Sequence, residues 1–159
     1  MNRRLLPVVV ALAACATPGP RPLPTSPAAA STTAPSPAAG ERFAAAAATQ
    51  IGQPYRWGGA APGGFDCSGL VAYAAAVAGL HVPRTTTEQI AAGVPVERRQ
   101  LRPGDLVFMH LSRKALHVGV ALDDRRFVHA PSQGGRVRVD SLDTSYYARA
   151  FIGARRITD

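Results

Sequence analysis

The stretch Phe65-Asp66-Cys67-Ser68-Gly69-Leu70 decides how this chain is interpreted. It follows a glycine-rich loop and opens the segment 67–80, whose apolar residues recur at helical spacing. Asp66 is typical of a helix N-cap, which places Cys67 in the first helical turn. There the backbone N–H groups lack partners within the helix, and the helix macrodipole stabilises an anion. Because the thiolate is the nucleophilic form of cysteine, the pattern predicts a reactive Cys67.

Residues 1–14 have the pattern of a signal peptide, with two arginines, a short apolar run and small residues before a cleavage site. The apolar run is far too short to span a bilayer as a mature helix. The tetrad Leu12-Ala13-Ala14-Cys15 resembles the bacterial lipoprotein box, in which the cysteine is lipidated and becomes the first mature residue. We therefore expect a lipid on Cys15, and ordinary signal cleavage nearby is the alternative.

Residues 15–40 are expected to form the lipidated N-terminus and a disordered linker, because Pro, Ala, Ser and Thr dominate them. Such a composition buries too little apolar surface to offset the entropy of ordering. The folded domain is expected at 41–159, which is long enough to bury a core without disulfides. If Cys15 carries lipid, Cys67 has no partner in the chain, which is unusual for an exported domain and indicates a free reactive thiol.

The chain is basic, with 18 Lys and Arg against 10 Asp and Glu and a formal net charge of +8. A basic surface aids solubility and also favours association with polyanions, of which anionic cell-wall polymers are available outside the membrane. The sequence lacks the interleaved aromatic and basic residues that bind single-stranded nucleic acid. We therefore expect no nucleic-acid partner.

The order of the expected elements indicates an α+β domain with an antiparallel sheet, because helical patterns come first and short strand patterns follow. The N-terminal helices are expected to pack on a sheet of roughly five strands. The expected helices span 43–51, 67–80 and 86–92, and the expected strands span 106–110, 116–122, 126–130, 137–139 and 151–157.

Two histidines are expected on neighbouring strands. His117 shares one face of its strand with Gly119 and Ala121, while the opposite, valine-bearing face is assigned to the core. The face of small residues leaves room for the cysteine helix to approach closely. A hairpin register centred on residue 123 would place His117 directly opposite His129, with Cβ atoms about 4.5–5.5 Å apart. A register that differs by one residue would weaken this pair, and the sequence does not fix the register.

A cysteine, a histidine and an orienting polar group together form a catalytic triad. One histidine takes the thiol proton and later gives it to the leaving amine, and the third group fixes that histidine's tautomer. A lone strand histidine is more often structural, and a lone cysteine is more often a small buried hydrophobe. A metal site is conceivable from the same three residues, but the helix-borne thiol explains their context better, so no metal or cofactor is expected.

Six sequence blocks resemble, in order, the motifs of the NlpC-type cell-wall cysteine peptidases. The resemblance covers nearly all of 41–157, and it implies a compact papain-like fold and cleavage of peptidoglycan stem peptides next to D-glutamate or diaminopimelate. The blocks are Tyr55-Arg56-Trp57-Gly58-Gly59, Phe65-Asp66-Cys67-Ser68-Gly69-Leu70-Val71, Pro83-Arg84, Leu101-Arg102-Pro103-Gly104-Asp105-Leu106-Val107-Phe108, His117-Val118-Gly119-Val120 and Phe127-Val128-His129-Ala130.

The resemblance also implies roles for single residues. Cys67 is the nucleophile of a thioester acyl-enzyme, His117 the general base and acid, and His129 the group that orients it. Tyr55 matches a family tyrosine that stabilises the oxyanion, although it is also a candidate packing aromatic. Asp66 and Ser68 match positions that in some members bind the free amine of the stem peptide, although both also suit the helix N-terminus.

The expected partners are peptidoglycan stem peptides and, through the lipid, a membrane. Since Ala16 does not resemble the inner-membrane retention signal, we expect the periplasmic face of the outer membrane, and we expect a monomer. Two alternatives remain open from the sequence. One is a non-catalytic wall-binding lipoprotein that kept the fold, and the other is an acyltransferase or amidase that uses the same triad.

Overall fold

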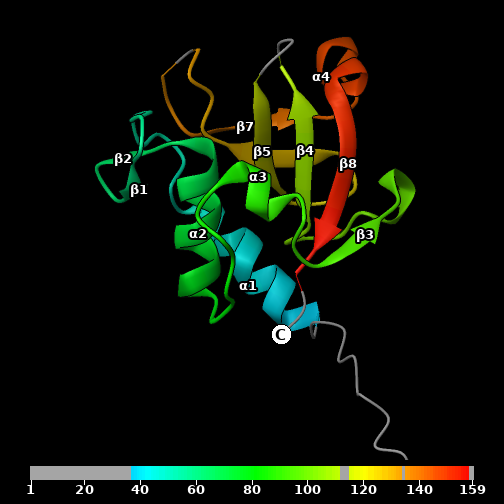
Figure 1. The fold of residues 1–159 in the computed structure, drawn as a ribbon, viewed down its shortest axis with the longest axis horizontal. Helices are drawn as coiled ribbons and strands as arrows, with labels where there is room; N and C mark the ends of the chain where they lie inside the picture. Colours follow the sequence, from blue (N-terminus) through cyan, green and yellow to red (C-terminus); the bar gives the residue numbers. More distant parts are fainter. Residues whose placement is uncertain (1–36, 112–114, 134, 158–159) are drawn as a thin grey trace, which may run out of the picture. The chain divides into compact units, whose positions relative to one another are not determined.

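The computed structural model describes residues 37–111, 115–133 and 135–157 (Figure 1). The expected signal peptide, Cys15 and most of the expected linker therefore lie outside the described residues. The first helix, α1 (Pro37–Ala48), begins four residues before the expected domain start at Glu41. A proline suits the first turn of a helix, and Ala39 is only 4% exposed, so residues 37–40 belong to the folded domain rather than to a linker.

The other helices are short. The cysteine-bearing helix α2 (Cys67–Val77) is followed by α3 (Thr86–Gln89) and by the 3₁₀ turn η1 (Arg98–Gln100). Helix α4 (Ser145–Ala150) was not expected from the sequence, and Thr144 caps it by accepting a hydrogen bond from the Tyr147 N–H. Within the described ranges, no helix is both long enough and apolar enough to cross a bilayer.

A six-stranded antiparallel sheet forms the other part of the domain, which confirms the α+β class. Its strand order is β3-β8-β4-β5-β6-β7, one strand more than expected. The additional strand is β3, an edge strand that contains Pro95 and lacks a strand-like apolar pattern. The strands are β3 (Val94–Val96), β4 (Leu106–His110), β5 (Leu116–Ala121), β6 (Arg126–His129), β7 (Arg138–Ser141) and β8 (Phe151–Arg156), and a separate small hairpin pairs β1 (Ala60–Ala61) with β2 (Gly64–Phe65).

The register of the β5–β6 hairpin differs by one residue from the expected one. Ala121 pairs with Phe127 and Val120 with Val128, so the hairpin centres on residue 124. The cause is the turn, in which the Asp123 carboxylate accepts hydrogen bonds from the N–H groups of the two arginines that follow residue 124. His129 therefore stands opposite Gly119 rather than opposite His117, so the hairpin has the register, different by one residue, that the sequence left open.

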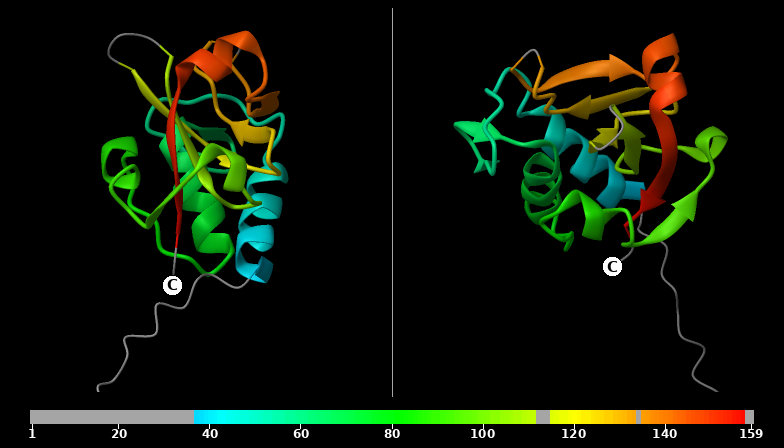
Figure 2. Two further views of the ribbon diagram at one scale, coloured as in Figure 1. Left: turned by 90° about the vertical axis from the view of Figure 1, so that its right-hand side faces the viewer. Right: turned by 45° about the horizontal axis from the view of Figure 1, so that its top comes forward.

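The two faces of β5 contact different layers. Its valines pack with α1 and α2 in the larger of two apolar clusters, as expected for the core face. The opposite face packs against β6 and α4 through Ala121, Phe127 and Tyr147 in the second cluster. The valine face of β5, rather than its small-residue face, therefore packs with the apolar side of α2. Figures 1 and 2 show β6 and β7 running crosswise to β4 and β5.

Candidate active site

Cys67 is the first residue of α2, as expected, and it is partly exposed and unpaired. Asp66 caps the helix in an extended conformation and accepts a hydrogen bond from the Gly69 N–H at 2.6 Å. The Cys67 Sγ lies 3.7 Å from the Thr86 Oγ1, which comes from the first turn of α3. The cap and the helix start are therefore confirmed, and Thr86 is a neighbour of the sulfur that sequence reasoning missed.

The two histidines are joined directly. The Nε2 of His117 lies 2.7 Å from the Nδ1 of His129, and the two rings are nearly perpendicular. His117 is 6% exposed and His129 is fully buried. Because the register places them diagonally rather than opposite each other, the two side chains bridge the gap through their ring nitrogens.

The chain of hydrogen bonds continues to Asp140 on β7. The Nε2 of His129 lies 2.8 Å from the Asp140 Oδ2. The same oxygen accepts hydrogen bonds from the Arg138 Nε at 2.9 Å and from the Tyr147 hydroxyl at 2.8 Å. Sequence reasoning missed Asp140, Arg138 and Tyr147, because their proximity to His129 depends on the pairing of β6 with β7 and on the unexpected helix α4.

Burial keeps both imidazoles neutral near pH 7. Burial, together with the neighbouring His129, lowers the pKa of His117 to about 3. Burial also lowers the pKa of His129, although Asp140 acts in the opposite direction. Burial raises the pKa of Asp140, but the hydrogen bonds from His129, Arg138 and Tyr147 bring this pKa below its ordinary value. The contact between His129 and Asp140 is therefore a hydrogen bond from a neutral ring to a carboxylate.

Tyr55 packs against the same apolar cluster as Cys67, and its backbone forms a bridge with Phe65, which precedes the capping aspartate. Burial raises the pKa of the Tyr55 phenol, and negative charge on Cys67 and on Asp66 raises it further. The hydroxyl thus stays protonated near pH 7 and remains able to donate a hydrogen bond.

Asp66 and Ser68 are both hydrogen-bonded to Arg84, which lies just before α3. The Arg84 guanidinium donates to both carboxylate oxygens of Asp66, at 2.7 and 3.0 Å, and to the Ser68 Oγ at 2.9 Å. The carboxylate also accepts the N–H groups of Gly58 and Gly69. Burial raises the pKa of Asp66, but the hydrogen bonds from Arg84, the Gly69 N–H and Ser68 together with the charge of Arg84 bring it below its ordinary value.

A buried glutamine joins α3 to the first turn of α2. Gln89 is fully buried, and its Nε2 donates to the backbone carbonyls of Ser68 at 3.0 Å and Pro83 at 2.7 Å. This bridge fixes α3, and with it Thr86, beside the cysteine.

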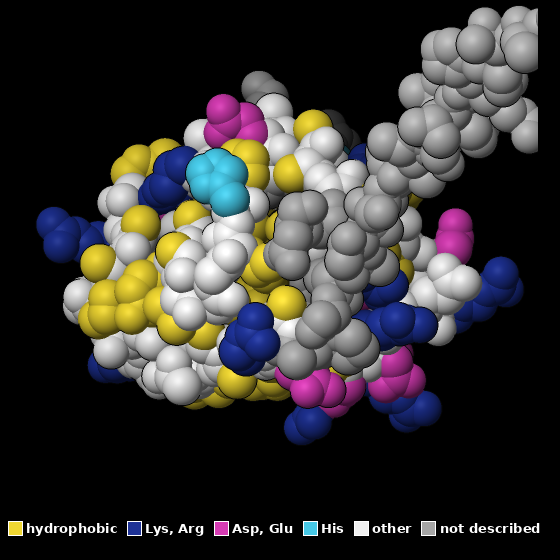
Figure 3. Space-filling view, turned by 90° about the horizontal axis from the view of Figure 1, so that it is seen from below, with side chains coloured by type: hydrophobic (Ala, Val, Ile, Leu, Met, Phe, Trp, Pro, Cys, Tyr) yellow, Lys and Arg dark blue, Asp and Glu magenta, His cyan; other side chains and the backbone are white. Residues whose placement is uncertain are grey.

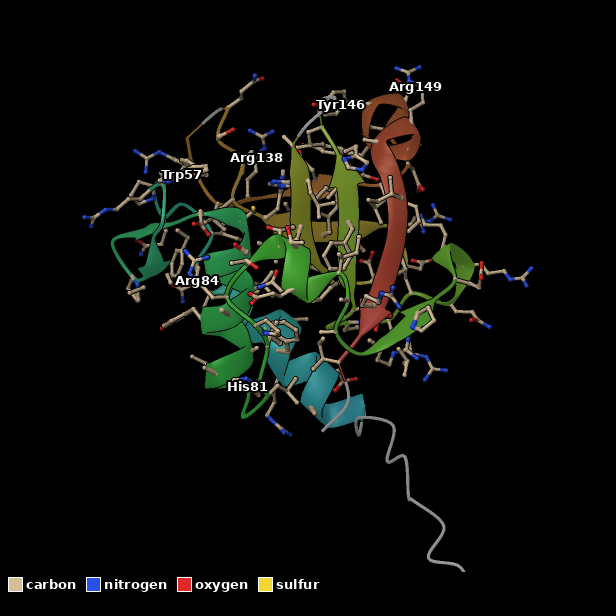
Figure 4. The ribbon with its side chains drawn as sticks, viewed as in Figure 1. Trp57, His81, Arg84, Arg138, Tyr146 and Arg149 are labelled. Atoms are coloured by element: carbon tan, nitrogen blue, oxygen red, sulfur yellow. The ribbon has the colours of Figure 1, made fainter. Side chains whose placement is uncertain are left out.

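The remaining histidines, His81 and His110, are exposed. Figure 4 shows His81 below the C-terminal end of α2, far from Arg138 and the upper part of the sheet. Among the described residues, no group of three or more His, Cys, Asp or Glu is arranged to hold a metal ion. No hydrogen bond joins Cys67 to His117 in the described part of the chain, so their pairing stays a prediction.

The model of the NlpC/P60 family matches residues 52–156, which include every residue of the chain of contacts described above. The chain belongs to the NlpC/P60 family. The matched region begins four residues after the end of α1 and extends to the end of β8.

Two of the similar proteins carry the names of wall enzymes. The chain is 43% identical over 114 residues to the murein DD-endopeptidase MepH of Escherichia coli, an alignment that covers 68% of this chain and 42% of MepH. It superposes on NlpC2 from Trichomonas vaginalis with a TM-score of 0.70 at 29% identity, covering 76% of this chain and 47% of NlpC2. For the peptidoglycan hydrolase RipB of Mycobacterium tuberculosis the TM-score is 0.64 at 30% identity, covering 76% of this chain and 65% of RipB. The chain thus spans less than half the length of MepH.

Proposed function

We propose that this NlpC/P60 protein is a cysteine endopeptidase that hydrolyses amide bonds in the stem peptides of peptidoglycan. The observation that carries the proposal is the hydrogen-bonded row from His117 through His129 to Asp140, on strands beside a helix that begins with an unpaired cysteine. The names of MepH and RipB support the substrate class.

The first half of the proposed reaction acylates Cys67. The thiol proton passes to the Nδ1 of His117, and the thiolate attacks the carbonyl carbon, whose π electrons move to oxygen. The Cys67 N–H and the Tyr55 hydroxyl stabilise this oxyanion. When the tetrahedral intermediate collapses, the C–N bond breaks, and the leaving amine takes the proton from His117. A thioester remains on Cys67.

The second half of the reaction hydrolyses the thioester. His117 removes a proton from a water molecule, and the hydroxide attacks the thioester carbonyl. The C–S bond then breaks, the thiolate recovers the proton from His117, and the new carboxyl product leaves. One water molecule is consumed for each amide bond cut.

Asp66 and Ser68 remain proposed substrate contacts, but Arg84 limits how they act. A stem-peptide amine would have to share the Asp66 carboxylate with a guanidinium that already contacts both of its oxygens. The proposed roles are therefore to hold the first turn of α2 in place and to bind substrate on the side that Arg84 leaves open.

The test uses purified full-length chain and isolated sacculi. The wild-type chain should release new amino groups, and Cys67→Ala should abolish the release while leaving the circular dichroism spectrum unchanged. Ser132→Ala, on an exposed loop residue, is the control and should retain activity. Equal activity in Cys67→Ala would overturn the proposal.

Product analysis separates the proposal from the two alternatives. Hydrolysis of a stem peptide gives a pair of fragments whose masses sum to the substrate plus one water, whereas acyl transfer does not. A non-catalytic wall-binding protein would give no fragments and would need no unusual reactivity of Cys67 toward iodoacetamide.

We propose in addition that Cys15 carries the lipid and tethers the domain to the periplasmic face of the outer membrane. The support is the sequence motif Leu12-Ala13-Ala14-Cys15 and the proposed wall substrate. Cys15→Ser should move the protein from the membrane fraction to the soluble fraction. An unchanged fractionation and an unlipidated mature N-terminus in the wild-type chain would refute the anchor.

A further inference from the structure

Asp140 is the point where three hydrogen bonds converge. Its Oδ2 accepts from the Nε2 of His129, the Nε of Arg138 and the hydroxyl of Tyr147. An ionised carboxylate only accepts hydrogen bonds. The Nε2 of His129 must therefore carry a proton.

The position of that proton determines the protonation of both rings. A neutral imidazole carries a single ring proton, so the Nδ1 of His129 is an acceptor once its Nε2 is protonated. The Nε2 of His117, 2.7 Å away, must then be the donor. His117 is neutral as well, which leaves its Nδ1 with a free lone pair.

His129 is held in this orientation by its surroundings. It is fully buried, and both of its ring nitrogens have partners. The Tyr147 ring packs against it nearly edge-on and the Phe127 ring packs at a tilt. A flipped ring would put carbon atoms against both Asp140 and His117 and would lose two hydrogen bonds.

We propose that Asp140 is a positioning residue that acts through His129 to keep the Nδ1 of His117 unprotonated. This inference rests on the proposed function, in which the Nδ1 of His117 takes the thiol proton. Asp140 does not touch the substrate in this account. It sets the tautomer of the second histidine in the row, and that histidine sets the tautomer of the first.

The direct test is ¹⁵N NMR of the full-length chain with labelled histidine, at a pH near 8. In the wild-type chain the ring nitrogens should show a proton on Nε2 of both His117 and His129. In Asp140→Ala both rings should show a mixture of tautomers. A wild-type His129 protonated on Nδ1 would overturn the proposal without any variant, and the same holds for unchanged tautomers in Asp140→Ala.

Turnover of a soluble crosslinked muropeptide gives the second readout. Asp140→Ala should lower kcat by about tenfold to a hundredfold, as the loss of an outer partner of a site histidine commonly does, with KM nearly unchanged. Unchanged kcat would contradict the proposal. If the wild-type chain is inactive on every wall substrate, the proposed function fails while the tautomer result still decides this inference.

Three further variants distinguish the effect of the Asp140 carboxylate from the effects of neighbouring groups. Asp140→Asn keeps an oxygen acceptor for His129 and removes the charge, so it should keep the wild-type tautomers. Tyr147→Phe removes a different donor from the same oxygen and should also keep them. Asp143→Asn alters a half-exposed aspartate that pairs with Arg98 and should match the wild type in both readouts.

Discussion

At the scale of single residues, the Cys67 sulfur has the Thr86 hydroxyl beside it at 3.7 Å. A hydroxyl in this position donates to a thiolate and favours the charged form. Gln89 holds the α3 turn that presents this hydroxyl, so its position is built into the fold.

Thr86→Val removes the hydroxyl and keeps the shape of the side chain. A hydrogen bond of about 0.5–1.5 kcal/mol corresponds to a roughly twofold to tenfold slower reaction of Cys67 with iodoacetamide at neutral pH. Thr86→Ser keeps the hydroxyl and should react like the wild type. Equal rates in all three proteins would show that the hydroxyl does not influence the sulfur.

The buried histidines also make stability depend on pH. The pKa of His117 is about 3 in the folded chain, well below its ordinary value near 6.5, and the pKa of His129 is lowered too. Between about pH 3 and pH 6.5, His117 therefore binds a proton in the unfolded chain but not in the folded chain. The stability that depends on His117 is full above about pH 6.5 and falls as the pH drops toward 3, with a slope of about 1.4 kcal/mol per pH unit. His129 acts in the same direction, because its pKa is also lowered in the folded chain.

Urea unfolding between pH 8 and pH 4 measures this slope. His117→Asn should flatten the curve relative to the wild type, whereas His81→Asn, at an exposed position, should not. A wild-type free energy of unfolding that stays constant from pH 6.5 to pH 4 would contradict the account.

At the scale of elements, β5 and β6 meet closely because Gly119 has no side chain. A Cβ built at Gly119 would lie 2.6 Å from the Phe127 ring, 3.0 Å from the Val128 carbonyl oxygen and 3.2 Å from the His129 Cβ. The contact between the two histidines depends on this close approach.

Gly119→Ala should therefore lower the free energy of unfolding by about 1–3 kcal/mol, the usual cost of overpacking. It should also reduce kcat, because His129 is displaced from His117. Chemical unfolding and muropeptide turnover measure the two effects. A variant with wild-type stability would show that the strands do not need the glycine.

The local helices and strands were predictable from the sequence, but the strand register and most side-chain contacts between elements were not. The Asp66 cap and the start of α2 follow from adjacent residues, as do β4 and the centres of β5 and β6. The register around Asp123 depends on side-chain bonds to the turn, and Asp140 reaches His129 only after β7 pairs with β6. Strand β3 and helix α4 have no periodic pattern of their own. Strand β3 forms by pairing with β8, and α4 packs on the sheet through Tyr147.

At the scale of the whole domain, α1 ties the start of the folded chain to the loop before β4. A Cβ built at Gly40 would lie 2.5 Å from the Pro103 carbonyl oxygen, and one built at Gly104 would meet the Gly40 backbone. Ala39 is buried in the same region.

The described arginines do not gather in one patch on the face seen in Figure 3 but lie among apolar and acidic side chains.

A chain that begins at Ser36 should therefore be more stable than one that begins at Glu41. The longer chain retains the first turn of α1 and the contact between Gly40 and Gly104, and each kcal/mol retained raises Tm by about 4 °C. Thermal unfolding of the two chains measures the difference. Equal Tm values would place the domain start at Glu41, as the sequence composition suggested.

The most direct test of the proposed function is the acyl-enzyme itself. A crosslinked muropeptide is mixed with the full-length chain, the reaction is quenched in acid, and the mass of the intact protein is measured by mass spectrometry. The account predicts an adduct of the acyl half of the substrate on Cys67, absent in Cys67→Ala together with all cleavage. Cleavage that continues in Cys67→Ala, or that proceeds in the wild-type chain by a route that never modifies Cys67, would contradict it.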